Sequence, residues 1–175
     1  MISYTLLEFE ELNSTSNFLK ENQTYFPNMT IIKANHQTGG RGQFDRKWES
    51  EPDQNLLFSI LLKHVHVTKA FEIKRWIVSG MMNYLQKKNI AVTFKEPNDI
   101  YVEDQKLCGI LIETQSSSNI FDYVIIGIGL NVNQKIFDQS KATSLSIILN
   151  QTCNIKHIFS EILNILIEGY EQIIL

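Results

Sequence analysis

The stretch His36-Gln-Thr-Gly-Gly-Arg-Gly-Gln-Phe-Asp-Arg-Lys-Trp48 carries most of the information in this chain about its fold. It holds three glycines, which let the backbone approach a ligand closely and adopt positive φ without a Cβ penalty. Its two arginines supply forked donors for carboxylates and phosphates, and its tryptophan offers a flat surface for a ring. The stretch predicts a loop that closes over a small anion, with a nucleotide as the favoured ligand. A mobile basic surface loop is the alternative that this stretch alone leaves open.

Apolar runs on both sides of this loop predict strands. Thr30–Ala34 is a short strand that leads into the loop, and Asn55–Val65 is a nearly continuous apolar run. A run of this kind is typical of a strand that is covered on both faces. The glycine-rich loop is therefore expected to connect two strands.

The second half of the chain alternates short apolar segments with tight turns. A long helix is expected over Thr68–Asn89, and strands over four later segments: Ala91–Phe94, Ile100–Val102, Lys106–Thr114 and Phe121–Gly129. Their connections are too short for crossover helices, so they predict an antiparallel meander. Further helices are expected to start at Ser14 and to cover Thr143–Asn150 and Ile155–Ile174. The predicted fold class is α/β, with a mixed, largely antiparallel sheet flanked by helices.

The bulk composition is that of an ordinary globular protein with one domain. The chain has 175 residues, of which 43% are hydrophobic and 20% charged, and its net charge is −3. This charge gives no general electrostatic footprint for nucleic acid, so DNA is not an expected partner. Two cysteines form no disulfide framework, and no signal peptide or long apolar span is seen. A cytoplasmic setting without membrane association is therefore expected.

Four further blocks carry residue types that suit the same chemistry as the loop. They are Ser14-Thr15-Ser16-Asn17, Lys95-Glu96-Pro97-Asn98-Asp99, Lys106-Leu107-Cys108-Gly109-Ile110-Leu111-Ile112-Glu113 and Gly127-Ile128-Gly129-Leu130-Asn131. The last block does not indicate a Rossmann domain, because it opens no convincing helix and lacks a third glycine. Together with the loop, and in this order, the blocks resemble the catalytic domain of biotin protein ligases (biotin–[acetyl-CoA-carboxylase] ligases).

The resemblance implies a fold related to class II aminoacyl-tRNA synthetases, with residues 1–175 forming one catalytic domain. Family members of the repressor type carry a DNA-binding module in front, for which residues 1–12 are expected to leave no room. Most members continue into a small SH3-like barrel, which is expected to be absent here. A monomer and a homodimer are both left open, as is whether the chain is a short form or a fragment.

The resemblance also implies a two-step reaction on biotin and ATP, with Mg²⁺ as the accompanying cation. The biotin carboxylate attacks the α-phosphate of ATP and gives biotinyl-5′-AMP and pyrophosphate. A lysine of the biotin carboxyl carrier protein domain of acetyl-CoA carboxylase, or of a related carboxylase, then attacks the mixed anhydride. Because the first step brings two anions together, the site needs cations where charge accumulates. Lys106 and Arg41 are the expected catalytic residues, and the Lys106 ammonium can bridge the carboxylate and the α-phosphate.

The resemblance assigns the remaining site residues to two halves. The biotin half is expected to contain Ser14, Thr15, Ser16, Gln37, Gly40, Arg41, Gly42, Gln43, Lys106 and Gly109. Neutral polar groups suit the uncharged ureido ring, because a buried charge would be costly there. The ATP half is expected to contain Trp48 as the surface for adenine, together with Asn98, Asp99, Gly127, Gly129 and Asn131. Asp99 is also the expected ligand of Mg²⁺, since hard cations prefer carboxylate oxygens.

Two positions depart from the family pattern. Glu96 stands where the family has tryptophan in Lys-Trp-Pro-Asn-Asp, and Gln43 replaces the second arginine of Gly-Arg-Gly-Arg. That arginine is expected to help hold the adenylate, and Arg46 is the nearby candidate to compensate. Two alternative functions stay open at this point. One is a lipoate-protein ligase, which shares the fold and the adenylation chemistry, and the other is a non-catalytic biotin-binding or regulatory module.

Overall fold

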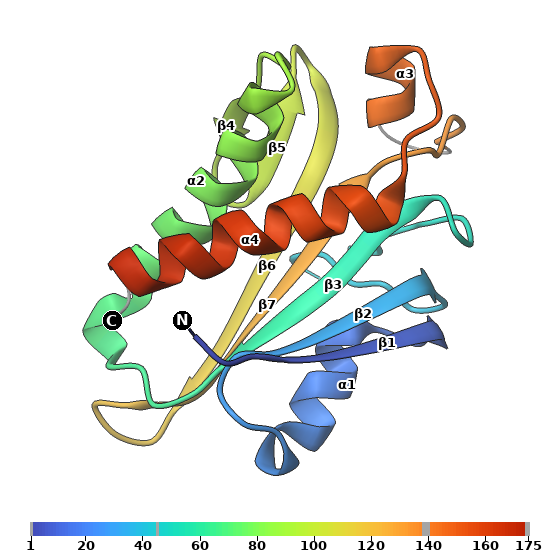
Figure 1. Cartoon of the computed structure of the whole chain (residues 1–175). Helices are drawn as coiled ribbons and strands as arrows, with labels where there is room; N and C mark the ends of the chain where they lie inside the picture. The colour runs from blue at the N-terminus through green and yellow to red at the C-terminus, as the bar shows by residue number, and fades with distance from the viewer. Residues whose placement is uncertain (1, 45, 138–140, 174–175) are drawn as a thin grey trace.

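Seven strands form one sheet with helices on both faces in the computed structural model, which describes residues 2–44, 46–137 and 141–173 (Figure 1). Within these residues the strand order is β1-β2-β3-β7-β6-β5-β4. The strands are β1 (Thr5–Leu12), β2 (Thr30–Gln37), β3 (Asn55–Leu62), β4 (Thr93–Lys95), β5 (Asp99–Val102), β6 (Gln105–Ser116) and β7 (Phe121–Asn131). The helices are α1 (Thr15–Asn22), α2 (Ala70–Lys87), α3 (Leu145–Leu149) and α4 (Ile155–Ile173), with 3₁₀ turns at Gln23–Tyr25 and Val67–Lys69.

The strand pairing confirms the mixed, largely antiparallel sheet and adds one parallel pair. Strands β4 to β7 are successive antiparallel neighbours, and β3 pairs antiparallel with both β2 and β7. Strand β1 runs parallel to β2, with Thr5 opposite Thr30. No strand is predicted for β1, because its three glutamates weaken the apolar pattern. A parallel pair needs a crossover connection, and α1 supplies it.

The predicted boundaries differ from the observed ones by a few residues. Strand β2 continues to Gln37 and β7 to Asn131, while β3 ends at Leu62 rather than at Val65. Helix α2 begins at Ala70, because the preceding residues form a 3₁₀ turn. The predicted end of the last helix at Ile174 lies outside the described residues.

Strand β3 is the buried centre of the sheet, as its apolar run predicts. All of its residues are buried. Leu56, Phe58 and Ile60 belong to the main core with α2 and α4, whereas Leu61 belongs to a smaller cluster with α1. Because side chains alternate along a strand, Ser59 points to the same side as Leu61. Ser59 is therefore a polar residue placed under α1 in an otherwise apolar stretch.

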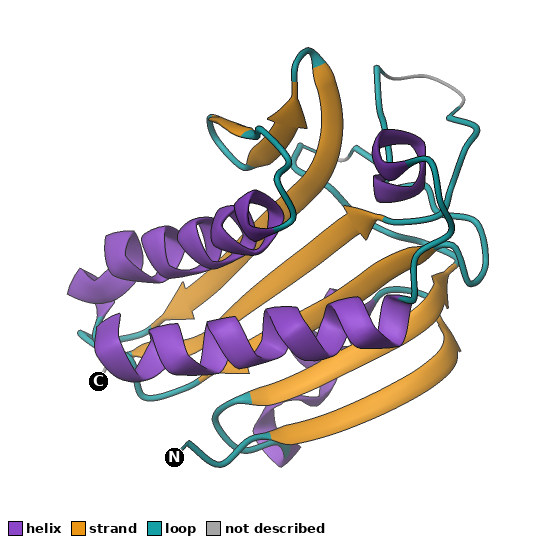
Figure 2. Cartoon of the chain, turned by 45° about the horizontal axis from the view of Figure 1, so that its top comes forward, coloured by secondary structure: helices purple, strands orange, loops and turns teal. Residues whose placement is uncertain are grey.

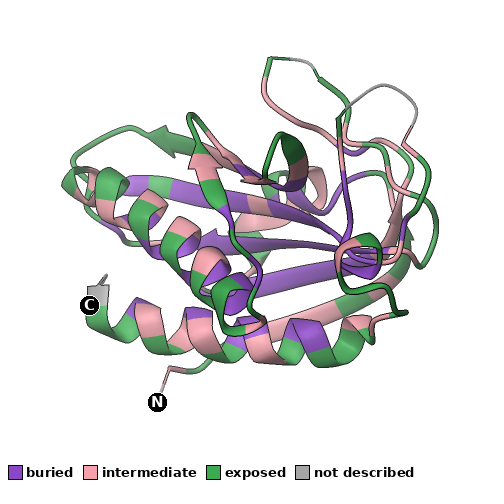
Figure 3. Ribbon diagram, turned by 90° about the horizontal axis from the view of Figure 1, so that it is seen from above, coloured by how far each residue is buried: buried purple, intermediate pink, exposed green. Residues whose placement is uncertain are grey.

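Helices α2 and α4 lie side by side on one face of the sheet, and α1 lies on the other (Figures 1 and 2). Trp76 on α2 is fully buried, and its indole N–H donates to the Leu166 carbonyl of α4 at 2.8 Å. The strands are largely buried between these layers, while the outward sides of the helices are exposed (Figure 3). Within the described residues, none of the helices combines the length and apolar character needed to cross a membrane.

Gly80 is the point on α2 where α4 comes nearest. A Cβ atom added there would lie 2.5 Å from Leu166 Cδ2, in a buried environment. We expect Gly80→Val to lower the free energy of unfolding by about 1–3 kcal/mol, because overpacked cores must shift. Urea unfolding measures this loss, and the dependence of the unfolding free energy on urea concentration should stay unchanged. Ser79→Val, on the exposed side of the same helix, is the control, and an equal loss there would contradict the packing argument.

Candidate active site

The floor of the site is a patch of sheet without side chains. Gly109 on β6 and Gly129 on β7 are direct partners across the two strands, and Gly127 follows on the same face. A Cβ atom at Gly129 would lie 2.5 Å from Trp48 Cε2, and one at Gly109 would lie 2.7 Å from Trp48 Cζ3. The indole of Trp48 therefore rests on the backbone of both strands. The sequence predicts that these glycines line the ligand site; all three line the cavity described below, and Gly109 and Gly129 also lie against the Trp48 ring.

The N-terminus of α1 brings hydroxyl groups to this floor. Ser14 caps the helix, and its Oγ accepts the backbone N–H of Asn17 at 3.3 Å. Ser16 is buried against β7, where a Cβ atom at Gly127 would lie only 2.6 Å from its Oγ. The third glycine therefore makes room for a hydroxyl of α1. The helix cap and the ligand-facing role predicted for this block are compatible.

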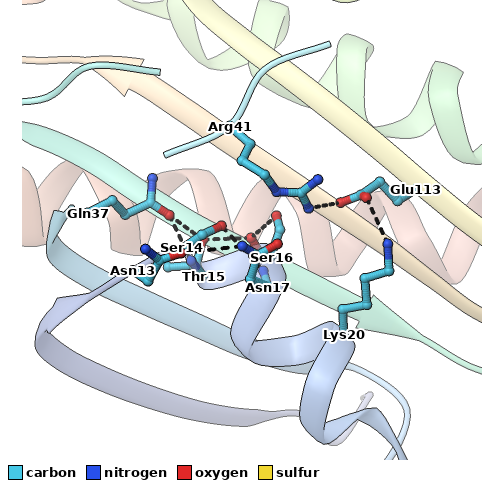
Figure 4. A network of polar contacts seen from close by, with 10 residues as sticks. Asn13, Ser14, Thr15, Ser16, Asn17, Lys20, Gln37, Arg41 and Glu113 are labelled. Atoms are coloured by element: carbon cyan, nitrogen blue, oxygen red, sulfur yellow. Dashed lines mark hydrogen bonds and ion pairs between the residues drawn. The ribbon is translucent and has the colours of Figure 1, made fainter. Parts of the chain in front are cut away.

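A chain of hydrogen bonds joins α1 to the sheet (Figure 4). Thr15 donates its backbone N–H and its hydroxyl to Gln37 Oε1, at 2.8 and 3.0 Å. Ser59 Oγ lies 2.7 Å from Thr15 Oγ1 and 2.9 Å from Ser16 Oγ. All three hydroxyl-bearing residues are buried.

The direction of these bonds follows from Gln37, whose Oε1 can only accept. Thr15 uses its single hydroxyl proton on Gln37, so Ser59 must donate to Thr15. Ser59 then has no proton left, so Ser16 must donate to Ser59. The chain runs from Ser16 through Ser59 and Thr15 to Gln37. Ser16 Oγ can therefore only accept from a ligand, while the Gln37 amide N–H groups and the Ser14 hydroxyl can donate.

The glycine-rich loop is a short hairpin. Arg41 pairs with Lys47 as an antiparallel bridge, and the Gly42 N–H donates to the Arg46 carbonyl at 2.7 Å. The sequence leaves two uses open for the loop glycines, close approach of the backbone and positive φ, and the structure shows the first of these. All eight glycines have negative φ, and Phe44 at the hairpin tip has φ 53° instead.

Gly40 is needed at the base of this hairpin for close approach. A Cβ atom there would lie 2.4 Å from the Trp48 carbonyl oxygen. The Trp48 N–H also donates to the Gly40 carbonyl at 3.0 Å. The close approach at Gly40 therefore fixes the Trp48 backbone, and with it the point from which the indole reaches Gly109 and Gly129.

An ion pair fastens the hairpin to the sheet. Arg41 Nη2 donates to Glu113 Oε2 on β6 at 2.5 Å, and Lys20 Nζ on α1 lies 3.4 Å from Glu113 Oε1 (Figure 4). Arg41 Nε is buried and has no hydrogen-bond partner among the described residues. One end of the guanidinium is therefore held, while Nε is left for a ligand. Glu113 closes the third sequence block, but no role is predicted for it.

Lys106 and Asp99 form a second ion pair across the end of β6. Lys106 Nζ lies 2.8 Å from Asp99 Oδ1, and the two side chains are 26% and 17% exposed. The same ammonium lies 5.3 Å from the centre of the Trp48 ring. The predicted catalytic lysine, the predicted metal ligand and the tryptophan are therefore neighbours.

Asn131, which is predicted to line the ATP half, also holds two segments of the backbone together through its side chain. It is buried, and its Nδ2 donates to the Thr143 carbonyl at 3.0 Å. Its side chain also lies 3.5 Å from the Lys106 carbonyl. Asn131 therefore links the start of β6 to the segment before α3, next to the predicted catalytic lysine. Asn98 accepts the Ile110 N–H at its carbonyl oxygen, which leaves its side chain for a ligand.

These groups surround a cavity of about 940 Å³. All the predicted site residues except Gly40 line it, and Gly40 lines a neighbouring hollow on the hairpin. The cations among the described lining residues are Arg41, Arg46, Lys47, Lys95 and Lys106. The carboxylates among them are Glu49, Glu96 and Asp99. The cavity therefore has a positive excess, which suits an anionic ligand.

Arg46, Lys95 and Tyr101 also line this charged side, although the sequence predicts a role only for Arg46, as the candidate to compensate for Gln43. Lys95 Nζ lies 3.9 Å from the centre of the Tyr101 ring. Burial, and next the charge of Asp99, raise the pKa of Tyr101, and the positive charge of Arg46 opposes them. Arg46 is therefore close enough to act on the same part of the cavity.

Two residues of the sequence blocks turn out not to be reactive groups. Burial raises the pKa of the Cys108 thiol to about 12, so this cysteine is a small apolar side chain rather than a nucleophile. Glu96 is largely exposed and forms an ion pair with Lys74 of α2. The residue that replaces the family tryptophan is thus tied to a helix at the rim of the cavity.

The donor set does not form a resident metal centre. The described residues contain no cluster of three or more histidine, cysteine, aspartate or glutamate side chains that could hold a metal ion. Asp99 is a single carboxylate, and Lys106 already neutralises it. This set fits a Mg²⁺ ion that arrives with nucleotide phosphates, because Mg²⁺ is often held by one or two carboxylates plus phosphate oxygens.

Comparison with known proteins identifies the family of this chain. A model of the biotin/lipoate A/B protein ligase family matches residues 8–131. The bifunctional ligase/repressor BirA of Bacillus subtilis (strain 168) is 33% identical over 127 residues, which cover 69% of this chain and 39% of that protein. BirA of Escherichia coli (strain K12) is 30% identical over 132 residues, 74% of this chain and 41% of that protein. The chain thus spans about two fifths of the length of these relatives.

Solved structures share the fold over nearly the whole chain. A biotin protein ligase from Aquifex aeolicus, in complex with biotin and ATP, has a TM-score of 0.83 at 29% identity and covers 97% of this chain and 72% of its own. LipL1 of P. falciparum, in complex with lipoate, has a TM-score of 0.63 at 16% identity, over 97% of this chain and 63% of its own. The second likeness concerns the fold alone. With the family match spanning most of the sheet, the chain belongs to the biotin/lipoate A/B protein ligase family.

Proposed function

We propose that this chain is the catalytic domain of a biotin protein ligase. It activates biotin as biotinyl-5′-AMP at the expense of ATP and transfers it to a lysine of a biotin carboxyl carrier protein domain, in the cytoplasm. The observation that carries this proposal is the directed hydrogen-bond chain from Ser16 to Gln37. It supports the proposal because it defines the chemistry of the ligand's uncharged end.

The free groups of that chain match a cyclic urea. Ser16 Oγ can only accept, which suits a ligand N–H, while the Gln37 amide and the Ser14 hydroxyl can donate to a ligand carbonyl. The ureido ring of biotin carries both groups side by side. The dithiolane ring of lipoate carries neither, so it would leave these buried polar groups unpaired at a cost. The pattern favours biotin over the lipoate-ligase alternative.

The cations of the cavity suit the adenylation step. Lys106 and Arg41 can bind the biotin carboxylate and the α-phosphate, whose mutual repulsion otherwise opposes the attack. The carboxylate oxygen attacks phosphorus, and pyrophosphate leaves with the electron pair of the broken P–O bond. Mg²⁺ bound to the phosphates would neutralise further charge, with Asp99 as its protein ligand. The hairpin excludes water, which protects the mixed anhydride until the carrier lysine attacks.

Pyrophosphate exchange is the experiment that tests this function. The chain, with ATP, labelled pyrophosphate and either biotin or lipoate, should exchange label into ATP with biotin only. Exchange with lipoate only would replace the proposal by a lipoate ligase. Biotin binding without exchange would instead identify a regulatory module, the alternative motivated by Gln43 and Glu96.

Lys106→Ala tests the assignment of the catalytic cation. We expect biotin-dependent exchange to fall by about 10²–10³, because an oriented charge at the reacting atoms is lost. Lys141→Ala is the matched control, since Lys141 is an exposed lysine paired with Asp104. Near-normal exchange in a folded Lys106→Ala variant would remove Lys106 from the mechanism.

Gln43→Arg tests the effect of the departure in the hairpin. A neutral amide binds phosphate without the full charge, and charge-assisted hydrogen bonds are roughly twice as strong. We expect the arginine variant to release biotinyl-AMP about tenfold more slowly, a change of about 1.4 kcal/mol. It should also label fewer lysines on a bystander protein that lacks a carrier domain.

The control for this variant is Gln86→Arg, which adds the same charge on the exposed side of α2. Stopped-flow release of adenylate and bystander labelling are measured for both variants and for wild type. Equal release rates in wild type and Gln43→Arg would mean that Arg46 already supplies the missing charge.

Glu113→Gln tests the fastening of the hairpin. Without the carboxylate, Arg41 loses its partner, so the hairpin should open more often. Since this pair is partly exposed, we expect a modest effect: adenylate release and tryptic cleavage at Arg46 and Lys47 should each rise about fivefold, or about 1 kcal/mol. Glu21→Gln, an exposed glutamate on α1, serves as control. Unchanged cleavage would show that Trp48 alone holds the hairpin.

A further inference from the structure

We propose that Ser59 is a specificity-determining positioning residue, which acts on the ligand through Ser16 and Thr15. It rests on the proposed function, because its readout is the affinity for biotin. Ser59 is fully buried in β3 and is not one of the described residues that line the cavity. Its role is to fix which hydroxyl donates and which accepts, before any ligand arrives.

The position of Ser59 is unusual for its strand. Its neighbours along β3 are leucine, phenylalanine and isoleucine, all buried. A hydroxyl in such surroundings is costly unless it is hydrogen-bonded. Ser59 meets this condition with two partners, Thr15 Oγ1 at 2.7 Å and Ser16 Oγ at 2.9 Å, both on α1. Opposite it on β7 stands Gly127, which leaves the space that Ser16 occupies.

Removing this hydroxyl has an effect on Ser16 that differs from its effect on Thr15. Thr15 remains fixed, because its N–H and O–H still bind Gln37 Oε1. Ser16, in contrast, loses the acceptor that takes its proton. Its hydroxyl can then turn its proton toward the cavity, where a ligand N–H needs an acceptor. Ser59→Ala therefore lets the Ser16 hydroxyl rotate, so that its oxygen is no longer held as an acceptor. The substitution changes none of the described residues that line the cavity.

The test compares wild type, Ser59→Ala and Ser59→Cys by calorimetry with biotin, and by pyrophosphate exchange for the KM of ATP. We expect the Kd of biotin to rise about tenfold or more in Ser59→Ala, since a preset buried hydrogen bond is lost. Ser59→Cys keeps a weak donor and acceptor of similar size, so its Kd should lie in between. The KM of ATP should stay within about twofold of wild type, because the hydrogen bonds of these hydroxyls run to Gln37 and not to Trp48, Asp99 or Lys106 of the nucleotide side.

Thr30→Val is the matched control. Thr30 is a fully buried residue on the neighbouring strand β2, and its hydroxyl donates to the Pro27 carbonyl at 2.9 Å. Losing this bond should lower the midpoint of thermal unfolding about as much as Ser59→Ala does, with biotin affinity unchanged. The pair therefore separates stability from ligand recognition.

A second probe asks whether the effect passes through the ligand N–H. Biotin methylated on the ureido nitrogens lacks that donor, so it should lose much affinity for wild type and less for Ser59→Ala. Equal biotin affinity in wild type and Ser59→Ala would overturn the role of Ser59. An equal loss for biotin and ATP, shared by Thr30→Val, would reduce it to a structural residue. If wild type binds lipoate and no biotin, the proposed function fails and this inference fails with it.

Discussion

The absence of side chains at the paired residues Gly109 and Gly129 is the constraint on which the site depends. Two glycines opposite each other weaken a sheet, since they add backbone entropy and pack nothing. Here they leave the space that the Trp48 indole fills, since a Cβ atom added at Gly129 would lie 2.5 Å from Trp48 Cε2. Because Trp48 ends the hairpin, its seat on the sheet also determines where Arg41 lies. A larger residue at either glycine would displace the tryptophan and, through the hairpin, the cation.

The two ends of the cavity solve different physical problems. At the α1 end, neutral groups donate and accept in a fixed order, so a polar uncharged ring is bound without burying a charge. At the other end Lys106, and beside α1 Arg41, are each paired with one carboxylate, which orients them. An incoming phosphate therefore competes with those carboxylates for Lys106 and Arg41, rather than meeting two unpaired cations. The site is therefore partly neutralised before the substrates arrive, which lowers the repulsion between its own cations.

Much of this could be predicted from sequence, and the exceptions have physical reasons. The meander and the central strand β3 followed from apolar runs and short turns, because such patterns are local. Strand β1 did not, since its pairing with β2 depends on a crossover through α1. The role of Ser59 was not predictable, because it arises only where β3 meets α1. Glu113 likewise gains its meaning from Arg41, which lies 72 positions away in the chain.

In the hairpin, the sequence motif predicts which residues line the cavity more reliably than what each residue does there. Glycine permits either positive φ or close approach, and here the positive φ lies at Phe44, whereas Gly40 is required for close approach to Trp48. Glycine is therefore needed at position 40 for its small size and not for a positive φ. Gln43 raises a related point, because the charge absent from its own position is present at Arg46, whose N–H binds the Gln43 carbonyl at 3.1 Å. Both side chains line the same cavity, so the Gln43→Arg comparison decides whether the charge at Arg46 replaces the one that the family pattern has at position 43.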